Sequence, residues 1–219
     1  MNWSEQVDIY CERTNFAFWA EPLNAITNIA FIIAALYCWN LAVRRNRMEG
    51  LTLLLLLLMT AVGIGSFLFH TMATRWAGAA DTTPILLFIL VYLYAATRRF
   101  FGAPVWMSVA VPILFVPFAI GFGAAWSSAM PSLNGSEGYF PVLVIIVVYG
   151  IALARLGHPA AGPLLAGAAV FSLSLTFRSI DGAVCAAIPI GAHFLWHIFN
   201  GVLLGTVLAA FIRHGAPRA

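Results

Sequence analysis

The hydrophobic positions of this 219-residue chain gather in seven long apolar stretches, with short polar segments between them. A run of about 20 apolar residues is long enough for a helix to cross a bilayer. Each stretch has roughly this length, so the pattern predicts seven transmembrane helices. The expected spans are residues 22–43, 51–71, 82–99, 104–125, 139–156, 161–179 and 185–212.

The composition excludes a water-soluble globule. Hydrophobic residues make up 62% of the chain and charged residues only 9%, against about 25% charged in an average soluble domain. The formal net charge is only +3, which gives no support to nucleic-acid binding. We therefore expect an all-α, polytopic membrane protein in which residues 1–219 form a single domain and residues 1–21 form an acidic segment outside the membrane.

The arginines predict the orientation in the membrane, because seven spans place the two termini on opposite sides. With the N-terminus outside, the inner segments carry Arg44, Arg45, Arg47, Arg98, Arg99, Arg155, Arg213 and Arg218, and the outer ones carry Arg13, Arg75 and Arg178. This asymmetry follows the positive-inside rule. The N-terminus is therefore expected outside and the C-terminus in the cytoplasm. The short loops and compact length favour a bacterial inner membrane.

Several polar side chains stand at membrane depth, where an ionisable group costs about 2.5–3.5 kcal/mol on insertion scales. Ser66 and His70 end the second span, Asp81 opens the third, and His193 and His197 lie in the seventh. The last two are four residues apart, so they project from one helical face about 6 Å apart along the axis. The expected orientation brings His70, Asp81 and His193 to a similar depth near the outer face.

This combination of residues is typical of a catalytic zinc site. Three neutral imidazoles and a water form the open tetrahedral arrangement in which zinc lowers the pKa of the water and polarises a carbonyl. Asp81 would be the general acid and base. The residues alone also allow a structural role, in which the histidines are hydrogen-bonded core residues joining helices and Asp81 pairs with one of them.

The spacing Ser66-x3-His70, then Asp81 eleven residues after that histidine, then His193-x3-His197 resembles the signature of the alkaline ceramidases. These enzymes belong to a superfamily that includes the progestin and adiponectin receptors. The resemblance covers the whole chain. It implies a seven-helix intramembrane zinc amidase that splits the N-acyl bond of a ceramide-like lipid into a sphingoid base, or an amine, and a fatty acid. The implied partners are this lipid and the membrane lipids, with no protein partner.

The resemblance also assigns roles to individual residues. His70, His193 and His197 would bind zinc. Asp81 would take a proton from the attacking water and later help deliver one to the leaving amine. Ser66 would donate a hydrogen bond to the developing oxyanion.

The N-terminal segment places three carboxylates, those of Asp8, Glu12 and Glu21, just outside the first span. Such crowding favours a cation, and hard oxygen ligands suit Ca²⁺. The resemblance implies a calcium site here, with Glu12 and Glu21 as its best ligands and Asp8, Tyr10 (through its carbonyl) and Thr14 as further ones. The residues alone equally allow a solvated acidic surface, with Glu21 favoured by the dipole of the first helix.

Cys11 and Cys185 both fall on the expected outer side, where an oxidising environment permits a disulfide. The residues alone leave two free thiols open as well. The resemblance supports the disulfide, which would tie the N-terminal segment to the start of the seventh span. Arg178 and Asp181, in the connection before that span, are expected to form a solvated surface pair.

Two other classes of function use the same features. A seven-helix receptor or signalling protein of the same superfamily would hold a structural zinc, and a transporter or proton channel would use the buried His/Asp group as a relay. Asp81 and Ser66 weigh against the receptor, because a structural zinc is usually closed by a fourth protein ligand. Clustering at one depth weighs against a relay across the bilayer. We therefore expect a lipid amide hydrolase.

Overall fold

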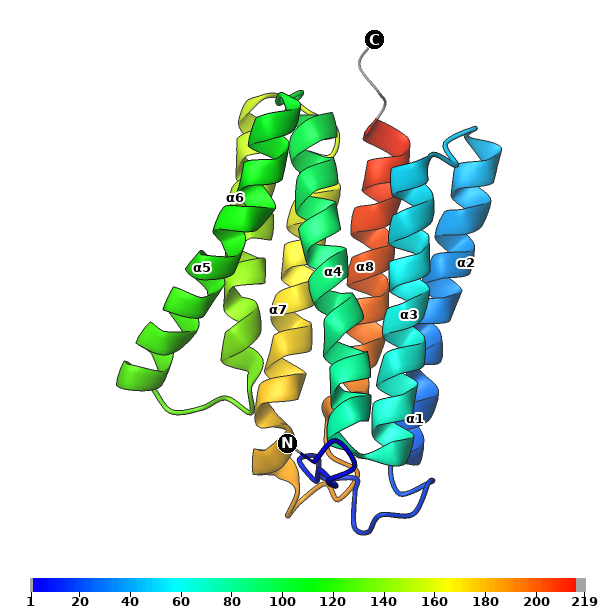
Figure 1. Ribbon diagram of the computed structural model, residues 1–219, viewed down its shortest axis with the longest axis vertical. Coiled ribbons are helices and arrows are strands. Elements are labelled where there is room, and N and C mark those ends of the chain that lie inside the picture. The colour runs from blue at the N-terminus through cyan, green and yellow to red at the C-terminus, as the bar shows by residue number, and fades with distance from the viewer. Residues whose placement is uncertain (1, 216–219) are drawn as a thin grey trace.

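The computed structural model describes residues 2–215, and seven helices in this part of the chain are long and apolar enough to cross a membrane. This confirms the predicted all-α, multi-pass class. The helices form an elongated bundle, with the N-terminal segment at one end and the last turn of α8 at the other (Figure 1). They are α1 (Pro22–Thr27), α2 (Ile29–Arg44), α3 (Gly50–Met72), α4 (Arg75–Phe100), α5 (Val105–Ala129), a 3₁₀ turn η1 (Ser136–Tyr139), α6 (Phe140–Arg155), α7 (Ala161–Val184) and α8 (His193–His214).

The first span consists of α1 and α2, which are interrupted at Asn28. The Nδ2 group of Asn28 donates to the backbone carbonyl of Asn24 at 2.8 Å, while its backbone N–H bonds to the carbonyl of Ala25 at 3.3 Å. An asparagine side chain that takes an i−4 carbonyl competes with the helical backbone ladder. This competition accounts for the break.

The central helix of the bundle is α8, which packs against α2, α3, α4 and α7. By contrast, α5 leans away from the bundle (Figure 1) and buries only Ser108 and Phe115. Large apolar side chains such as Trp106 and Leu114 are exposed on it. An apolar surface of this kind suits lipid rather than water.

Gly65 permits a close approach of α3 to α4. A β-carbon at this position would overlap the backbone carbonyl of Ala80, so only glycine allows this distance between the two helices. The next residues on the two helices, Ser66 and Asp81, consequently interact through their side chains.

The structure corrects the expected start of the third membrane span, which is helix α4. It begins at Arg75 rather than at residue 82, so Asp81 lies well inside the helix instead of opening it. The N-terminal segment fixes this start: the backbone N–H of Val7 donates to the carbonyl of Ala73 at 2.8 Å, and that of Arg75 donates to the carbonyl of Glu5 at 3.0 Å. The hydropathy pattern did not predict the turns over residues 75–81, because polar residues lower their mean hydropathy.

The start of the last helix is also corrected, from residue 185 to His193. Gly191 has a φ of +64°, a backbone conformation that favours glycine and ends regular helix. The backbone N–H groups of the next two residues, Ala192 and His193, donate to the carboxylate of Asp181. Residues 185–192 therefore form a connection, and the helix starts at the first of the two histidines.

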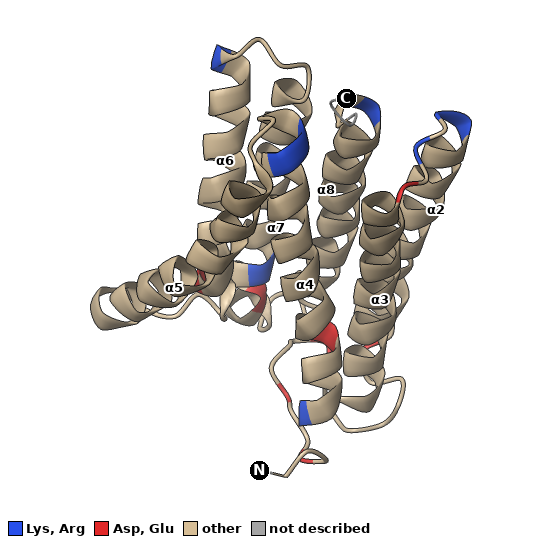
Figure 2. Cartoon of the chain, turned by 45° about the horizontal axis from the view of Figure 1, so that its top comes forward, with Lys and Arg blue, Asp and Glu red and all other residues tan. Residues whose placement is uncertain are grey.

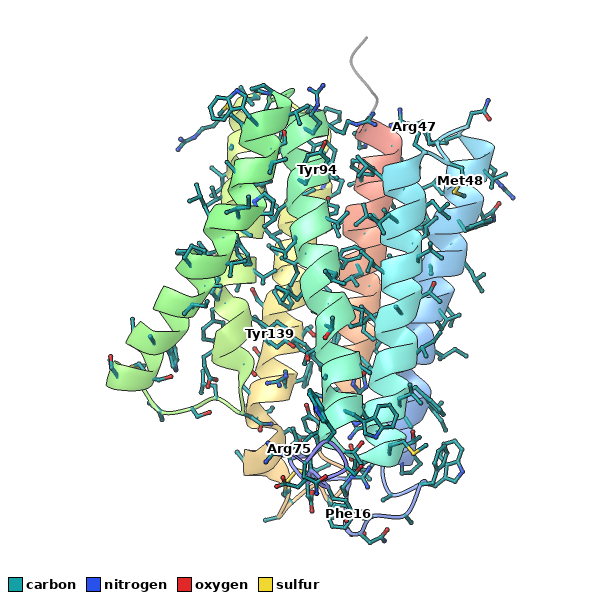
Figure 3. The ribbon with its side chains drawn as sticks, in the orientation of Figure 1. Phe16, Arg47, Met48, Arg75, Tyr94 and Tyr139 are labelled. Carbon is teal, nitrogen blue, oxygen red and sulfur yellow. A yellow bond between two sulfur atoms is a disulfide. The ribbon has the colours of Figure 1, made fainter. Side chains whose placement is uncertain are left out.

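Charged residues divide between the two ends of the bundle. The arginines gather mainly at the end opposite the N-terminus (Figure 2), where Arg47 lies, whereas Arg75 lies at the N-terminal end (Figure 3). This distribution agrees with the orientation expected from the positive-inside rule. The orientation itself stays a prediction.

Candidate metal centre and active site

Three histidines meet at the N-terminal end of the bundle. His70 comes from the last turn of α3, and His193 and His197 come from the first two turns of α8. One ligand atom from each ring lies within 4.8 Å of the others, and the three residues are only 1–2% exposed. This is the grouping that a single metal ion requires.

Each ring has a buried nitrogen without a hydrogen-bond partner: Nε2 of His70, Nδ1 of His193 and Nε2 of His197. Leaving a buried polar atom unpaired costs about 1–3 kcal/mol, so such atoms are rare in folded proteins. Three of them in one group could hold a metal ion, which would supply the missing partner of each nitrogen. Neutral imidazole nitrogens are common zinc ligands, so the donor set fits the expected metal.

Two of the rings are oriented by hydrogen bonds to their other nitrogen. Nδ1 of His70 lies 2.6 Å from Oε2 of Glu21, and Nδ1 of His197 lies 3.0 Å from the hydroxyl of Thr27. Bonds of this type fix the tautomer and leave Nε2 free for a metal. Burial raises the pKa of the Glu21 carboxyl, but hydrogen bonds from His70 and Asn24 and the charge of Arg13 outweigh burial and hold the pKa below its ordinary value.

His193 is positioned through its backbone and by ring stacking. The buried carboxylate of Asp181 accepts hydrogen bonds from the backbone N–H groups of Ala192 at 2.7 Å, His193 at 2.9 Å and Cys11 at 3.1 Å. A carboxylate in this place caps the N-terminus of α8. The ring of Tyr10 stacks on that of His193, with 3.7 Å between the centroids. Tyr10 and Asp181, which are far apart in sequence, thus both position the candidate ligand His193.

Ser66 lies one helical turn before His70 on α3, and Asp81 lies on the neighbouring helix α4. The carboxyl group of Asp81 interacts with the side chain of Ser66 and with His70. Both Asp81 and Ser66 line a cavity together with Trp196. Asp81 is half-buried and borders this cavity. The structure therefore brings a carboxyl group and a hydroxyl together near the candidate metal ligand His70, and their catalytic roles stay a prediction.

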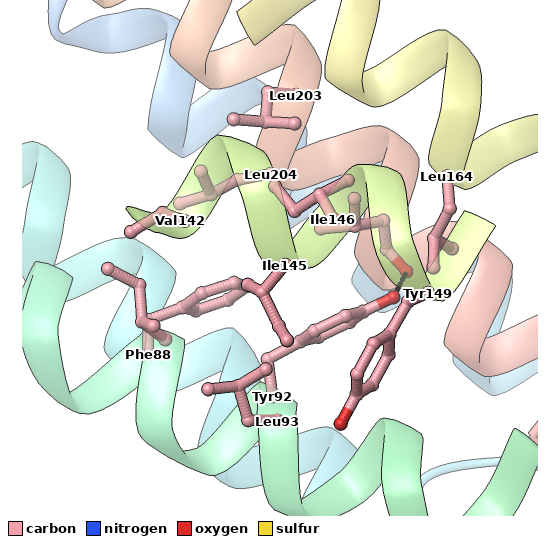
Figure 4. A pocket seen from close by; sticks show the side chains of 12 residues that line it. Phe88, Tyr92, Leu93, Val142, Ile145, Ile146, Tyr149, Leu164, Leu203 and Leu204 are labelled. Atoms are coloured by element: carbon pink, nitrogen blue, oxygen red, sulfur yellow. Dashed lines mark hydrogen bonds between the residues drawn. The ribbon is translucent and has the colours of Figure 1, made fainter. Parts of the chain in front are cut away.

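The cavity continues away from Asp81 along one face of α4. Phe88 and Val142 line both this cavity and a second one, so the two adjoin. The second cavity is apolar and ends among Tyr92, Tyr149 and neighbouring leucines (Figure 4). Asp81 and Tyr92 are eleven residues apart on α4, which places them about 16 Å apart along the helix axis. Figure 3 shows Tyr139 pointing into the bundle near the start of this path.

The expected calcium ligand Glu12 has both carboxylate oxygens engaged by backbone groups. Oε1 accepts from the N–H of Leu23 at 2.7 Å and Oε2 from the N–H of Asn24 at 2.8 Å. These bonds satisfy free amides in the first turn of α1. Burial raises the pKa of the Glu12 carboxyl, and the two backbone hydrogen bonds offset part of this effect.

The other residues expected around calcium are dispersed. Asp8 and Thr14 have exposed side chains, whereas Tyr10 is buried against His193. Glu21 is engaged by His70 and Arg13. Calcium binding at this segment stays a prediction.

Cys11 and Cys185 form a disulfide, with 5.3 Å between their Cα atoms. This confirms the expected pair. The bond joins the segment that carries Tyr10 to the connection that leads into His193. Cys38, in α2, is a free, buried cysteine.

The expectation of a solvated pair between Arg178 and Asp181 is wrong. Asp181 is only 1% exposed and binds backbone amides. The guanidinium of Arg178 instead lies 5.4 Å from the ring centroids of Tyr139 and Trp196, and it donates to the carbonyl of Asn134. The burial of Asp181 depends on contacts with the N-terminal segment, which leave no local pattern in the sequence.

A protein-family model described as Ceramidase matches residues 4–216, nearly the whole chain. No curated protein matches the chain.

Proposed function

The chain belongs to the ceramidase family, and we propose that it is an intramembrane, zinc-dependent amidohydrolase. Its substrate is ceramide or a related lipid amide, and its products are a sphingoid base, or an amine, and a fatty acid. Family membership supports hydrolysis of ceramide, and seven membrane-spanning helices support a substrate that resides in the bilayer. We further propose that the active site faces the outer side of a bacterial inner membrane.

One arrangement carries this proposal: three unpartnered imidazole nitrogens share one group, and one of the three histidines, His70, interacts with the carboxyl group of Asp81, which lines an apolar cavity. The imidazoles and the carboxyl group supply the chemistry of amide hydrolysis. The apolar cavity suits a hydrocarbon chain. A lipid amide is the substrate class that needs both features in one site.

The chain's own residues account for the proton transfers. A zinc ion on His70, His193 and His197 would polarise the amide carbonyl and lower the pKa of a water. Asp81 takes a proton from the attacking water while the water oxygen bonds to the carbonyl carbon. It then returns a proton to the amide nitrogen as the carbon–nitrogen bond breaks. The hydroxyl of Ser66 donates a hydrogen bond to the negative charge that develops on the carbonyl oxygen.

The cavity determines where the substrate's acyl chain lies. Phe88 and Val142, on α4 and α6, line both halves of it. With the acyl chain between these helices, the amide carbonyl lies next to Asp81 and the histidines. The cavity lining thus orients the scissile bond, and its length limits the acyl chain.

The receptor interpretation is less well supported. Among residues 2–215, the only group of His, Cys, Asp or Glu ligands close enough to share an ion contains three members. A structural zinc is normally closed by four protein ligands, whereas a catalytic zinc keeps an open position. Three ligands beside Asp81 therefore favour catalysis over a purely structural ion.

The test is fatty-acid release from a panel of N-acyl lipids by the purified protein and by Asp81→Asn. We expect release from at least one sphingoid amide, and a loss of about 100-fold or more in Asp81→Asn, since general acid–base catalysis contributes about 10²–10⁴-fold. Glu137→Gln, which alters a partly exposed carboxylate that does not line the cavity, is the matched control. Unchanged turnover in Asp81→Asn would refute the role of Asp81.

A further inference from the structure

Arg13 is a buried arginine at the centre of the N-terminal acidic segment. Its side chain is fully buried, and all three guanidinium nitrogens have partners. Nε donates to Oε1 of Glu21 at 2.5 Å, Nη1 to the carbonyl of Asn15 at 3.0 Å, and Nη2 to the carbonyl of His70 at 2.9 Å. A charge this deeply buried is kept in proteins only where it is paired and hydrogen-bonded.

Arg13 holds one candidate metal ligand, His70, through two sets of contacts. Through its backbone contact, the guanidinium holds the end of α3 at the carbonyl of His70. Through Glu21, whose Oε2 lies 2.6 Å from Nδ1 of His70, it holds the ring of the same residue. Asn24 donates a further hydrogen bond to Oε2 at 2.9 Å. The position and the rotation of the His70 ring therefore both depend on Arg13.

The same contacts leave few free oxygen ligands for a calcium ion at this segment. Calcium takes about 6–8 oxygen ligands. The carboxylate oxygens of Glu12 and Glu21 are all engaged by N–H donors, and Asp8 and Thr14 are exposed, whereas both glutamates are buried. The expected ligands do not form a calcium cage, and a guanidinium pairs with the buried carboxylate of Glu21.

We propose that Arg13 is the resident cation of the N-terminal segment: its guanidinium takes the place of calcium and positions the metal ligand His70 through Glu21. A guanidinium stays protonated at any pH at which the protein is folded, and its planar, rigid set of donors fixes the carboxylate of Glu21 and the carbonyl of His70 relative to each other. The segment therefore carries the positive charge that its carboxylates need. The link to catalysis rests on the proposed hydrolase function, whereas the link to metal affinity does not.

The experiment measures zinc affinity by competition with a chelator in the full-length protein and in Arg13→Ala and Arg13→Lys. The matched control is Arg75→Ala, which removes an exposed arginine paired with Glu5 at the same end of the molecule. We expect Arg13→Ala to lose about 10- to 100-fold in zinc affinity, the usual effect of removing a group that orients a metal ligand. Arg13→Lys keeps the charge and recovers part of this loss, and Arg75→Ala binds zinc like the wild type.

A second measurement needs no variant and therefore does not depend on folding of Arg13→Ala. Wild-type protein is stripped of calcium with a calcium-selective chelator, and its zinc affinity and lipid hydrolysis are compared before and after Ca²⁺ is added back. We expect neither to change. Wild-type zinc affinity in Arg13→Ala, no recovery in Arg13→Lys, or a calcium requirement in the wild type would overturn the proposal. Absence of hydrolysis in every sample would count against the proposed function alone, because zinc affinity is measured separately.

Discussion

The hydroxyl of Thr27 lies 3.0 Å from Nδ1 of His197 and 2.7 Å from the backbone carbonyl of Leu23. A hydroxyl has one hydrogen to donate. If that hydrogen goes to Leu23, the oxygen of Thr27 accepts the N–H of His197, and Nε2 of the ring keeps its lone pair for the metal. A threonine on the first span thus selects the tautomer of a metal ligand on the last.

Thr27→Val tests this relationship. Valine preserves the shape but removes the acceptor, so the ring of His197 loses the bond that fixes its tautomer. We expect zinc affinity to fall about 10-fold, as measured by chelator competition. Thr60→Val, which removes a hydroxyl that bonds only to its own helix, serves as the control. Equal zinc affinity in the two variants would contradict the assigned role.

Asp181→Ala addresses the start of α8. The substitution leaves the backbone N–H groups of Cys11, Ala192 and His193 without their acceptor. We expect a loss of stability of about 2 kcal/mol or more, seen as a lower thermal midpoint in detergent, and weaker zinc binding because His193 shifts. Asp8→Ala, at an exposed position of the N-terminal segment, should change neither. A thermal midpoint equal to that of wild type would mean that the cap is dispensable.

The close contact of α3 with α4 makes Gly65→Ala a test of active-site geometry. The added methyl group meets the carbonyl of Ala80, so the helices must separate and Ser66 must move away from Asp81. We expect turnover to fall at least about 10-fold. In Gly121→Ala the new methyl group meets no neighbour within 4 Å, so turnover should be retained. Full activity of Gly65→Ala would show that the spacing of the two helices does not control the reaction.

The junction of the two cavities offers a test of acyl-chain binding. Val142 lines both cavities, and at their far end Tyr92 is fixed by a hydrogen bond to the carbonyl of Val207 at 2.9 Å. Val142→Phe narrows the path, so turnover of long-chain amides relative to short-chain amides should fall about 10-fold or more. The competing substrates are compared in one assay.

Val148→Phe is the matched control for acyl-chain preference, since Val148 is an exposed residue of the same helix. It should leave the ratio of long-chain to short-chain turnover unchanged. If Val142→Phe also kept the wild-type ratio, the acyl chain would have to lie elsewhere.

Local patterns in the sequence predicted the seven spans and the gathering of His70, His193 and His197, which the structure confirms. Hydropathy identifies spans because the bilayer imposes a fixed apolar length. The i,i+4 spacing of two histidines identifies a shared helix face. Both signals are complete within a few turns of one helix.

The remaining features depend on contacts between distant segments. Arg13 is buried because it reaches His70, 57 positions along the chain, and Asp181 is buried because it reaches Cys11, 170 positions away. Neither partner can be inferred from neighbouring residues. The true start of α4 at Arg75 was missed for a related reason: the N-terminal segment fixes it, while hydropathy averages over its polar first turns.

Metal content is the most direct measure of the central claim that three imidazoles share one catalytic ion. Purified wild-type protein and the variants His70→Ala, His193→Ala and His197→Ala are assayed for bound zinc and for fatty-acid release. We predict about one zinc ion per wild-type chain, as expected for one three-histidine site, and loss of both zinc and hydrolysis in each variant. Wild-type protein that hydrolyses lipid amides without bound metal, or histidine variants that retain stoichiometric zinc, would contradict the account.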